Sequence, residues 1–194
     1  MRISVVRYHS ARTRRTSQLM RVRRYWFVAV IAVMVAVVGL LGRLRVNYTR
    51  SLPIGLYRTV RGGPIARGAT VLVCLPAPVA LFARERGYLW RGSCPGAAAR
   101  VGKLVLGVEG DVVGLTEAGL SVNGRHMPRT EPLPTDTKGR VVTHYPYGVY
   151  KVGRNEVWLY SPYHRMSFDS RYFGPVPAAN VESRLVAIWT TASN

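Results

Sequence analysis

An unbroken apolar segment near the N-terminus dominates the hydrophobic pattern of this chain. Residues 25–42, from Tyr25 to Gly42, carry no charge. As a helix, they would rise about 1.5 Å each and span roughly 27 Å, close to the thickness of a hydrocarbon core. Tyr25 and Trp26 open the segment, where aromatic side chains favour the membrane interface. The pattern predicts one transmembrane helix, with the lipid bilayer as a partner.

After this segment, short apolar runs alternate with turn residues, a pattern typical of β proteins. Asn123-Gly124 separates two such runs as a two-residue hairpin turn, and a short helix is expected at Pro78–Arg86. The polar, proline-rich residues 129–146 read as a long loop. We expect a mostly β fold, with antiparallel sheets in a partly closed barrel. The expected strands are Gly55–Val60, Thr70–Leu75, Lys103–Val108, Asp111–Leu115, Leu120–Val122, Arg125–Pro128, Tyr147–Val152, Glu156–Tyr160 and Val181–Ile188.

Positive charge is concentrated ahead of the apolar segment. The chain has a net charge of +19, and residues 1–24 hold eight arginines and no acidic residue. Basic residues stay on the cytoplasmic side of a membrane. We therefore expect a single-pass membrane protein, with a cytoplasmic tail (1–24), an anchor (25–42) and one periplasmic domain (43–194).

Two other interpretations of the N-terminus fit less well. A cleaved signal peptide has a shorter apolar core that ends in small residues, whereas here the sequence continues with Leu40-Leu41-Gly42-Arg43. An arginine-rich start can bind nucleic acid, but beside an apolar helix the arginines are explained by orientation and by anionic lipids. We expect an uncleaved anchor and no nucleic-acid partner.

The two cysteines, Cys74 and Cys94, both fall in the expected periplasmic domain. An oxidising compartment favours a disulfide between them, and two buried free thiols are the alternative. The chain has neither a CxxC nor an HExxH spacing, so we expect no metal site, and no cofactor motif is present.

Lysine usage points to a candidate base. Of 28 basic residues only three are lysines, namely Lys103, Lys138 and Lys151. Lysine can lose its proton in a protein, whereas arginine effectively cannot. Lys103 opens an apolar run, and burial on a strand would favour its neutral amine. Ser51, between turn residues just after the anchor, would then be a nucleophile near the bilayer. The alternative is a strand-end lysine whose ammonium reaches water.

Seven elements of the sequence occur in a characteristic order. They are Asn47-x-Thr49-x-Ser51-x-Pro53-x-Gly55-Leu56-Tyr57, Arg86-Gly87-Tyr88, Cys94-Pro95-Gly96, Lys103, Gly110-Asp111, Val122-Asn123-Gly124 and Ser167-Phe168-Asp169-Ser170-Arg171-Tyr172-Phe173-Gly174-Pro175. Together they resemble the signal peptidase I clan of serine–lysine peptidases, and more narrowly its TraF-type branch, the conjugative transfer signal peptidases. The ordered set is far more specific than any one element.

The resemblance implies roles for these residues. Ser51 would be the nucleophile, and Lys103 the general base. The Ser51 backbone N–H and the Thr49 hydroxyl would form the oxyanion hole. Ser167 would orient the lysine amine, and Asp169 would be a third residue needed for catalysis. Read alone, the segment from Ser167 to Pro175 could instead be a surface loop with turn-forming serines.

Further expectations follow from the same resemblance, among them a location in the bacterial inner membrane. Arg171 would pair with Asp169, and Ser170 would support the site. The substrate would be an exported precursor, most specifically a conjugative pilin, and other conjugation or secretion components would be partners. Water, or the N-terminal amine of the substrate in a cyclisation, would resolve the acyl-enzyme, and the sequence leaves this choice open.

Two departures from the clan stand out. Leu104 follows the candidate base where the clan usually has arginine, which removes a supporting contact. Pro53 lies two residues after Ser51, as in the TraF-type branch, rather than three as in general signal peptidases.

Three alternatives remain. A general signal peptidase would act on many preproteins, and a non-catalytic component of a pilus or secretion assembly would keep the fold without the reactivity. In a Ser–His–Asp triad, the best-placed histidine is His164, five residues before Asp169. No Gly-x-Ser-x-Gly elbow surrounds Ser51, which argues against this triad.

Overall fold

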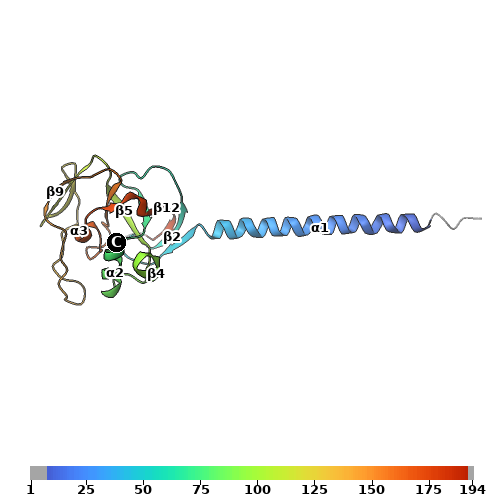
Figure 1. Cartoon of the computed structure of the whole chain (residues 1–194), viewed down its shortest axis with the longest axis horizontal. Coiled ribbons are helices and arrows are strands. Elements are labelled where there is room, and N and C mark those ends of the chain that lie inside the picture. Colours follow the sequence, from blue (N-terminus) through green and yellow to red (C-terminus); the bar gives the residue numbers. More distant parts are fainter. Residues whose placement is uncertain (1–7, 192–194) are drawn as a thin grey trace, which may run out of the picture. The chain divides into compact units, whose positions relative to one another are not determined.

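The computed structural model describes residues 8–191, which fall into two compact units divided after Arg43. The first unit is a helix, α1 (Tyr8–Leu41), drawn in blue in Figure 1. Its segment Arg23–Leu41 has 19 residues and a mean hydropathy of 2.2, so its length and composition are sufficient to cross a membrane. The helix continues upstream of the expected anchor, where arginine favours helical structure and no proline interrupts it.

The second unit, from Leu44 onward, consists mainly of two antiparallel sheets, which confirms the expected mostly β fold. The larger sheet has seven strands in the order β1-β2-β12-β3-β5-β10-β11, and the smaller has four in the order β8-β7-β6-β9. The larger sheet comprises β1 (Leu44–Asn47), β2 (Gly55–Val60), β12 (Val181–Thr190), β3 (Thr70–Val73), β5 (Val101–Gly107), β10 (Glu156–Tyr160) and β11 (Val176–Pro177). The smaller comprises β8 (Arg125–His126), β7 (Gly119–Val122), β6 (Val112–Thr116) and β9 (Gly148–Lys151).

Short helical elements and one further strand complete the second unit. These are α2 (Ala77–Glu85), β4 (Arg91–Cys94), the 3₁₀ turn η1 (Pro95–Ala97), α3 (Ser170–Phe173) and the 3₁₀ turn η2 (Ala178–Asn180). The helix α2 lies within one residue of its expected bounds. Residues 129–146 form the expected long loop, in which Thr135 and Val141 make an isolated bridge.

The buried apolar side chains form three clusters. The first packs α2 against the larger sheet and includes Ala80, Val105 and Leu159. The second lies between the two sheets, where Trp158 of β10 is 1% exposed. The third is small and consists of Leu52, Tyr57 and Leu185, with partly buried neighbours around it. This third cluster lies next to the candidate nucleophile, because Leu52 directly follows Ser51.

Candidate active site

Strand β5 buries Lys103 between two core valines. Side chains alternate across a strand, so Lys103 shares a face with Val101 and Val105, which are both buried. Lys103 itself is only 3% exposed, and it pairs in register with Val71 of β3. The apolar run that the sequence shows around this lysine therefore corresponds to a buried side chain.

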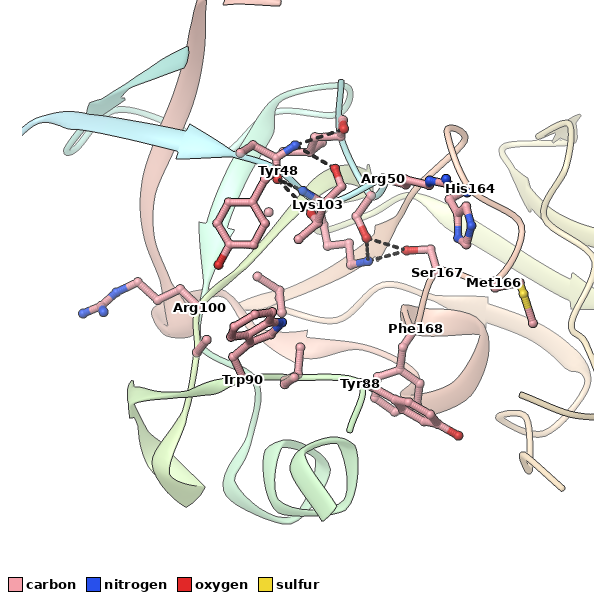
Figure 2. A pocket seen from close by; sticks show the side chains of 18 of the residues that line it. Tyr48, Arg50, Tyr88, Trp90, Arg100, Lys103, His164, Met166, Ser167 and Phe168 are labelled. Atoms are coloured by element: carbon pink, nitrogen blue, oxygen red, sulfur yellow. Dashed lines mark hydrogen bonds between the residues drawn. The ribbon is translucent and has the colours of Figure 1, made fainter. Parts of the chain in front are cut away.

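The amine of Lys103 lies against two serine hydroxyls from distant parts of the chain (Figure 2). Its Nζ is 3.0 Å from Oγ of Ser51 and also donates a hydrogen bond to Oγ of Ser167. The two hydroxyl oxygens are 3.2 Å apart. The structure thus brings the expected nucleophile, base and orienting serine together, within the reach that proton transfer requires.

Burial changes the chemistry of this amine. It lowers the pKa of Lys103 from 10.5 to about 8, because the ammonium loses its hydration. The carboxylate of Asp169 opposes this shift, and the guanidinium of Arg171 adds to it. With a pKa of about 8, about a tenth of the amine is uncharged at pH 7. A neutral amine can accept the hydroxyl proton of Ser51, so this site can activate a nucleophile.

The side chain of Asn47, at the end of β1, organises the loop that contains Ser51. Its Nδ2 donates to the backbone oxygens of Thr49, Leu52 and Pro53 at 2.9, 3.0 and 3.1 Å. Its Oδ1 accepts the backbone N–H of Thr49 at 3.2 Å. One amide group therefore fixes the chain on both sides of Ser51.

Thr49, the expected oxyanion-hole donor, is engaged elsewhere in this conformation. Its hydroxyl donates to Oδ1 of Asn47 at 2.8 Å. A hydroxyl has a single proton to donate, so Thr49 would have to turn its hydroxyl toward an arriving substrate carbonyl. Its role in the oxyanion hole stays a prediction.

Asp169 and Arg171 form an ion pair behind Ser167, and both side chains are 0% exposed. Nε and Nη2 of Arg171 donate to the two carboxylate oxygens at 2.8 and 2.9 Å. Nη2 also donates to the backbone oxygen of Ser167 at 2.8 Å. This two-bond geometry is among the strongest side-chain pairings, and it fixes the backbone of the serine that contacts the amine.

A further contact of the Asp169 carboxylate connects it to the residue that holds the Ser51 backbone. Its Oδ2 accepts the backbone N–H of Ser161 at 3.2 Å. Among the hydrogen bonds of residues 8–191, none joins this carboxylate to Ser51 or Lys103. Asp169 therefore holds groups next to Ser51 and Lys103 in place without a hydrogen bond to either residue.

The other expected supporting residues have structural contacts. The hydroxyl of Ser170 accepts the backbone N–H of Leu159 at 2.8 Å and so ties α3 to β10. Cys74 and Cys94 form the expected disulfide, which links the residue after β3 to the end of β4. The carboxylate of Glu182 lies near both sulfur atoms, but the sulfurs are bonded to each other and offer no thiolate to a metal ion.

A cleft of about 580 Å³ opens beside Ser51 and Lys103. Aromatic rings from separate segments border it, as Figure 2 shows for Tyr48, Trp90, Tyr88 and Phe168. The ring centroids of Tyr48 and Trp90 are 6.1 Å apart, and those of Tyr88 and Phe168 are 5.3 Å apart. Aliphatic side chains complete the apolar lining, namely Val46, Leu52, Leu72, Leu89, Val101, Leu133, Val142 and Leu185. The cleft is suited to an extended apolar peptide segment.

The rival base, His164, also lines the cleft. Burial lowers its pKa, and the nearby charges of Arg50, Lys103 and Arg171 lower it further. Within the part of the chain that the structure describes, no hydrogen bond joins its ring to Ser51, whereas Lys103 makes one. The geometry therefore favours the lysine as the base.

Sequence reasoning missed the contributions of Asn47 and Ser161. Asn47 belongs to the first motif, but its spacing alone does not show that its amide spans the loop. Ser161 has no motif signal in the sequence. Its hydroxyl donates to the backbone oxygen of Ser51 at 2.7 Å, a contact that only the packing of β10 against the loop creates.

Comparisons with known proteins identify the family of this chain. Residues 19–190 match the family described as signal peptidase, peptidase S26. A plasmid transfer protein TraF from Escherichia coli is 38% identical over 164 residues, covering 82% of this chain and 91% of that protein. A probable conjugal transfer protein TraF from Sinorhizobium fredii is 42% identical over 144 residues, covering 72% and 73%.

Further relatives extend the match. A conjugal transfer protein TraF from Agrobacterium tumefaciens is 36% identical over 165 residues, covering 84% of this chain and 91% of that protein. A crystal structure of a signal peptidase I from Enterococcus faecalis, 20% identical, aligns with a TM-score of 0.37 over 66% of this chain and all of that one. The family match and the identities above 30% establish that the chain belongs to the signal peptidase family, peptidase S26.

Proposed function

We propose that this protein is a membrane-anchored serine endopeptidase, with Ser51 as the nucleophile and Lys103 as the general base. The observation that supports this most is the 3.0 Å distance between Nζ of Lys103 and Oγ of Ser51, together with the burial of the lysine. A buried amine with a lowered pKa is suited to remove a serine proton. Membership of a peptidase family agrees with this chemistry.

Acylation would proceed in two steps. Oγ of Ser51 attacks the carbonyl carbon of the scissile peptide bond while neutral Lys103 takes the hydroxyl proton. The negative charge moves to the carbonyl oxygen, where the Ser51 backbone N–H and the Thr49 hydroxyl would stabilise it by about 3–4 kcal/mol per donor. The carbon–nitrogen bond then breaks as Lys103 returns the proton to the leaving amine. The product is an ester on Ser51.

A second nucleophile resolves the ester. Water or an amine attacks the ester carbonyl, Lys103 takes a proton from it, and Oγ of Ser51 leaves and recovers that proton. With water the product is a free carboxylate, and with the substrate's own N-terminal amine it is a cyclic peptide. We favour a pilin-like precursor as the substrate, because several relatives are conjugal or plasmid transfer proteins.

The substrate would bind as an extended segment. Strand β1 is at the edge of the larger sheet, and its residues Arg45, Val46 and Asn47 line the cleft. A peptide that pairs with this edge would gain main-chain hydrogen bonds that fix its register. Small pockets in the apolar lining would then select small side chains at the first and third positions before the cut.

The distribution of basic residues predicts how the protein is oriented in the membrane. The helix Arg23–Leu41 would anchor the protein, the arginine-rich N-terminus would stay in the cytoplasm, and the domain from residue 43 would work in the periplasm. The substrate would meet Ser51 as it emerges from the inner membrane, and other transfer or secretion components would deliver it.

Cleavage assays with variants test this proposal. In membranes that contain the full chain, Ser51→Ala and Lys103→Met should abolish processing of a co-expressed pilin precursor. Lys103→Arg should abolish it as well, because arginine keeps its proton. Lys138→Arg, in the exposed loop, is the matched control and should cleave normally. Full cleavage by Lys103→Arg would refute the neutral-amine mechanism.

A further inference from the structure

The loop that contains Ser51 is held in place by a buried hydroxyl that no motif singles out. Ser161 follows β10 and is 0% exposed. Its Oγ lies 2.7 Å from the backbone oxygen of Ser51. A carbonyl oxygen has no proton, so the serine hydroxyl must be the donor. A buried hydroxyl that uses its single proton on the nucleophile's own backbone fixes the orientation of the peptide group that follows Ser51.

Ser161 is itself held on its other side. Its backbone N–H donates to Oδ2 of Asp169 at 3.2 Å, and its Oγ accepts the backbone N–H of Tyr163 at 3.4 Å. The side chain of Arg171 in turn holds the Asp169 carboxylate with two hydrogen bonds. A continuous chain of hydrogen bonds thus runs from the buried ion pair, through Ser161, to the nucleophile.

We propose that Ser161 is a positioning residue that transmits the geometry of the Asp169–Arg171 pair to Ser51. This inference rests on the proposed function of Ser51 as the nucleophile. It gives a physical reason why a buried aspartate that contacts neither Ser51 nor Lys103 should matter for turnover. The Asp169–Arg171 pair thus acts on both Lys103 and Ser51. It acts on the Lys103 amine through the backbone of Ser167, and on the Ser51 hydroxyl through Ser161.

Positioning of this kind affects the rate and not the binding of substrate. Small displacements of a reacting group can reduce a rate by about 100-fold. Ser161 is absent from the residues that line the cleft, whereas Ser51 and Ser167 are among them. Loss of the Ser161 hydroxyl should therefore lower kcat and leave KM unchanged. The pKa of Lys103 should also stay where it is, since Ser161 is not among the groups that shift it.

Thr130 provides a matched control. It is also 0% exposed, and its hydroxyl donates to a backbone oxygen, that of Met127, at 2.6 Å. It lies outside the cleft lining. Thr130→Val and Ser161→Ala each remove one buried hydroxyl that donates to a carbonyl, so their costs to folding should be similar at roughly 1–3 kcal/mol. Only the second should affect catalysis.

The experiment measures kcat and KM for a fluorogenic precursor peptide, using the full chain in detergent micelles, with wild type, Ser51→Ala, Ser161→Ala, Ser161→Thr and Thr130→Val. Ser161→Ala should lower kcat by about 10- to 100-fold with an unchanged KM and an unchanged pH profile. Ser161→Thr keeps the hydroxyl and should recover much of the rate. Thr130→Val should match wild type in turnover.

The outcomes separate this inference from the proposed function. If wild type cleaves and Ser51→Ala does not, the proposed function holds. In that case, equal kcat values for Ser161→Ala and Thr130→Val would overturn the positioning role of Ser161 alone. If Ser51→Ala still cleaves, the proposed function itself is wrong and the positioning role falls with it. If Ser161→Ala does not fold, Ser161→Cys, a weaker donor of similar shape, must show the same selective loss. Normal turnover in that variant would also overturn the positioning role.

Discussion

Gly102 leaves the space that the side chain of Leu52 occupies. A Cβ atom on Gly102 would lie 2.6 Å from Cδ1 of Leu52, well inside van der Waals contact. Gly102 precedes Lys103 on β5, and Leu52 follows Ser51 and is 2% exposed. The absence of a side chain at position 102 therefore lets the loop with the nucleophile settle directly against the strand with the base.

A methyl group at position 102 should push the loop that contains Ser51 away from strand β5. We expect Gly102→Ala to cost about 1–3 kcal/mol of unfolding free energy through overpacking, and to lower kcat by at least about 10-fold because Ser51 moves away from Lys103. Urea denaturation and peptide cleavage measure the two effects. Adding Leu52→Val to Gly102→Ala shortens the opposing side chain and should restore part of the rate. No recovery in the double variant would show that this contact does not set the spacing.

The buried amine of Lys103 should make the protein less stable than it would be with an apolar side chain at position 103. Its pKa is about 8 in the folded state and 10.5 as a free side chain. Below pH 8 both states hold the proton, and the folded state bears the cost of a buried charge. Between pH 8 and 10.5 the unfolded state binds more protons, so this cost shrinks as the pH rises.

Lys103→Met should therefore stabilise the fold while abolishing cleavage. The full pKa difference corresponds to roughly 3 kcal/mol. We expect the unfolding free energy at pH 7 to rise by somewhat less, about 1–3 kcal/mol, because Met loses the hydrogen bonds to the two serines. Denaturation at pH 7 and pH 10 measures this gain, which should be clearly smaller at the higher pH. A variant that is less stable than wild type at pH 7 would contradict a costly buried ammonium.

Neutralising Asp169 should have two separable effects. Asp169→Asn leaves the guanidinium of Arg171 buried without its anionic partner, which should cost about 3–5 kcal/mol. The same change removes the carboxylate that opposes the lowered pKa of Lys103. In the folded fraction, the midpoint of the pH–rate profile should therefore move below pH 8. Glu182→Gln breaks the exposed ion pair with Arg100 and, as the control, should cost under about 1 kcal/mol and leave the profile unmoved.

The disulfide should contribute stability without taking part in the chemistry. Cys74 and Cys94 are 20 residues apart in sequence, and a loop of that length corresponds to about 3 kcal/mol in the chain-entropy treatment. Replacing both cysteines with alanine should lower the unfolding free energy by about that amount and leave the pH profile of cleavage unchanged. A reducing agent should destabilise wild type to a similar extent and have no effect on the double variant.

Much of the fold follows from local patterns. Strands β2 and β10 have the bounds that short apolar runs and turn residues predict, since each buries apolar side chains and is flanked by clear turn signals. Strands β1, β4 and β11 were not predicted. β4 reads Arg-Gly-Ser-Cys and has no apolar alternation, while β11 has only two residues. Such strands form because neighbours hold them in place, which a local pattern does not reveal.

The residues of the candidate site likewise fall into those that motifs predict and those that only the folded structure reveals. Ser51, Lys103 and Ser167 could be identified from motifs, because proton transfer restricts the residue types at those positions. The hydroxyl of Ser161 and the amide of Asn47 could not, because hydrogen bonds to backbone atoms leave little trace in the sequence. The space at Gly102 depends on where Leu52 packs, a contact between residues 50 positions apart that only the folded chain defines.

The pH dependence of Ser51 acylation tests the central claim most directly. The rate at which a serine-directed acylating probe labels Ser51, followed by intact mass from pH 6 to 10, should rise tenfold per pH unit at first and level off near pH 8, where Lys103 becomes neutral. Labelling should be absent in Lys103→Arg at every pH in this range. A pH-independent rate, or equal labelling of Lys103→Arg and wild type, would contradict the proposal that the uncharged amine of Lys103 activates Ser51.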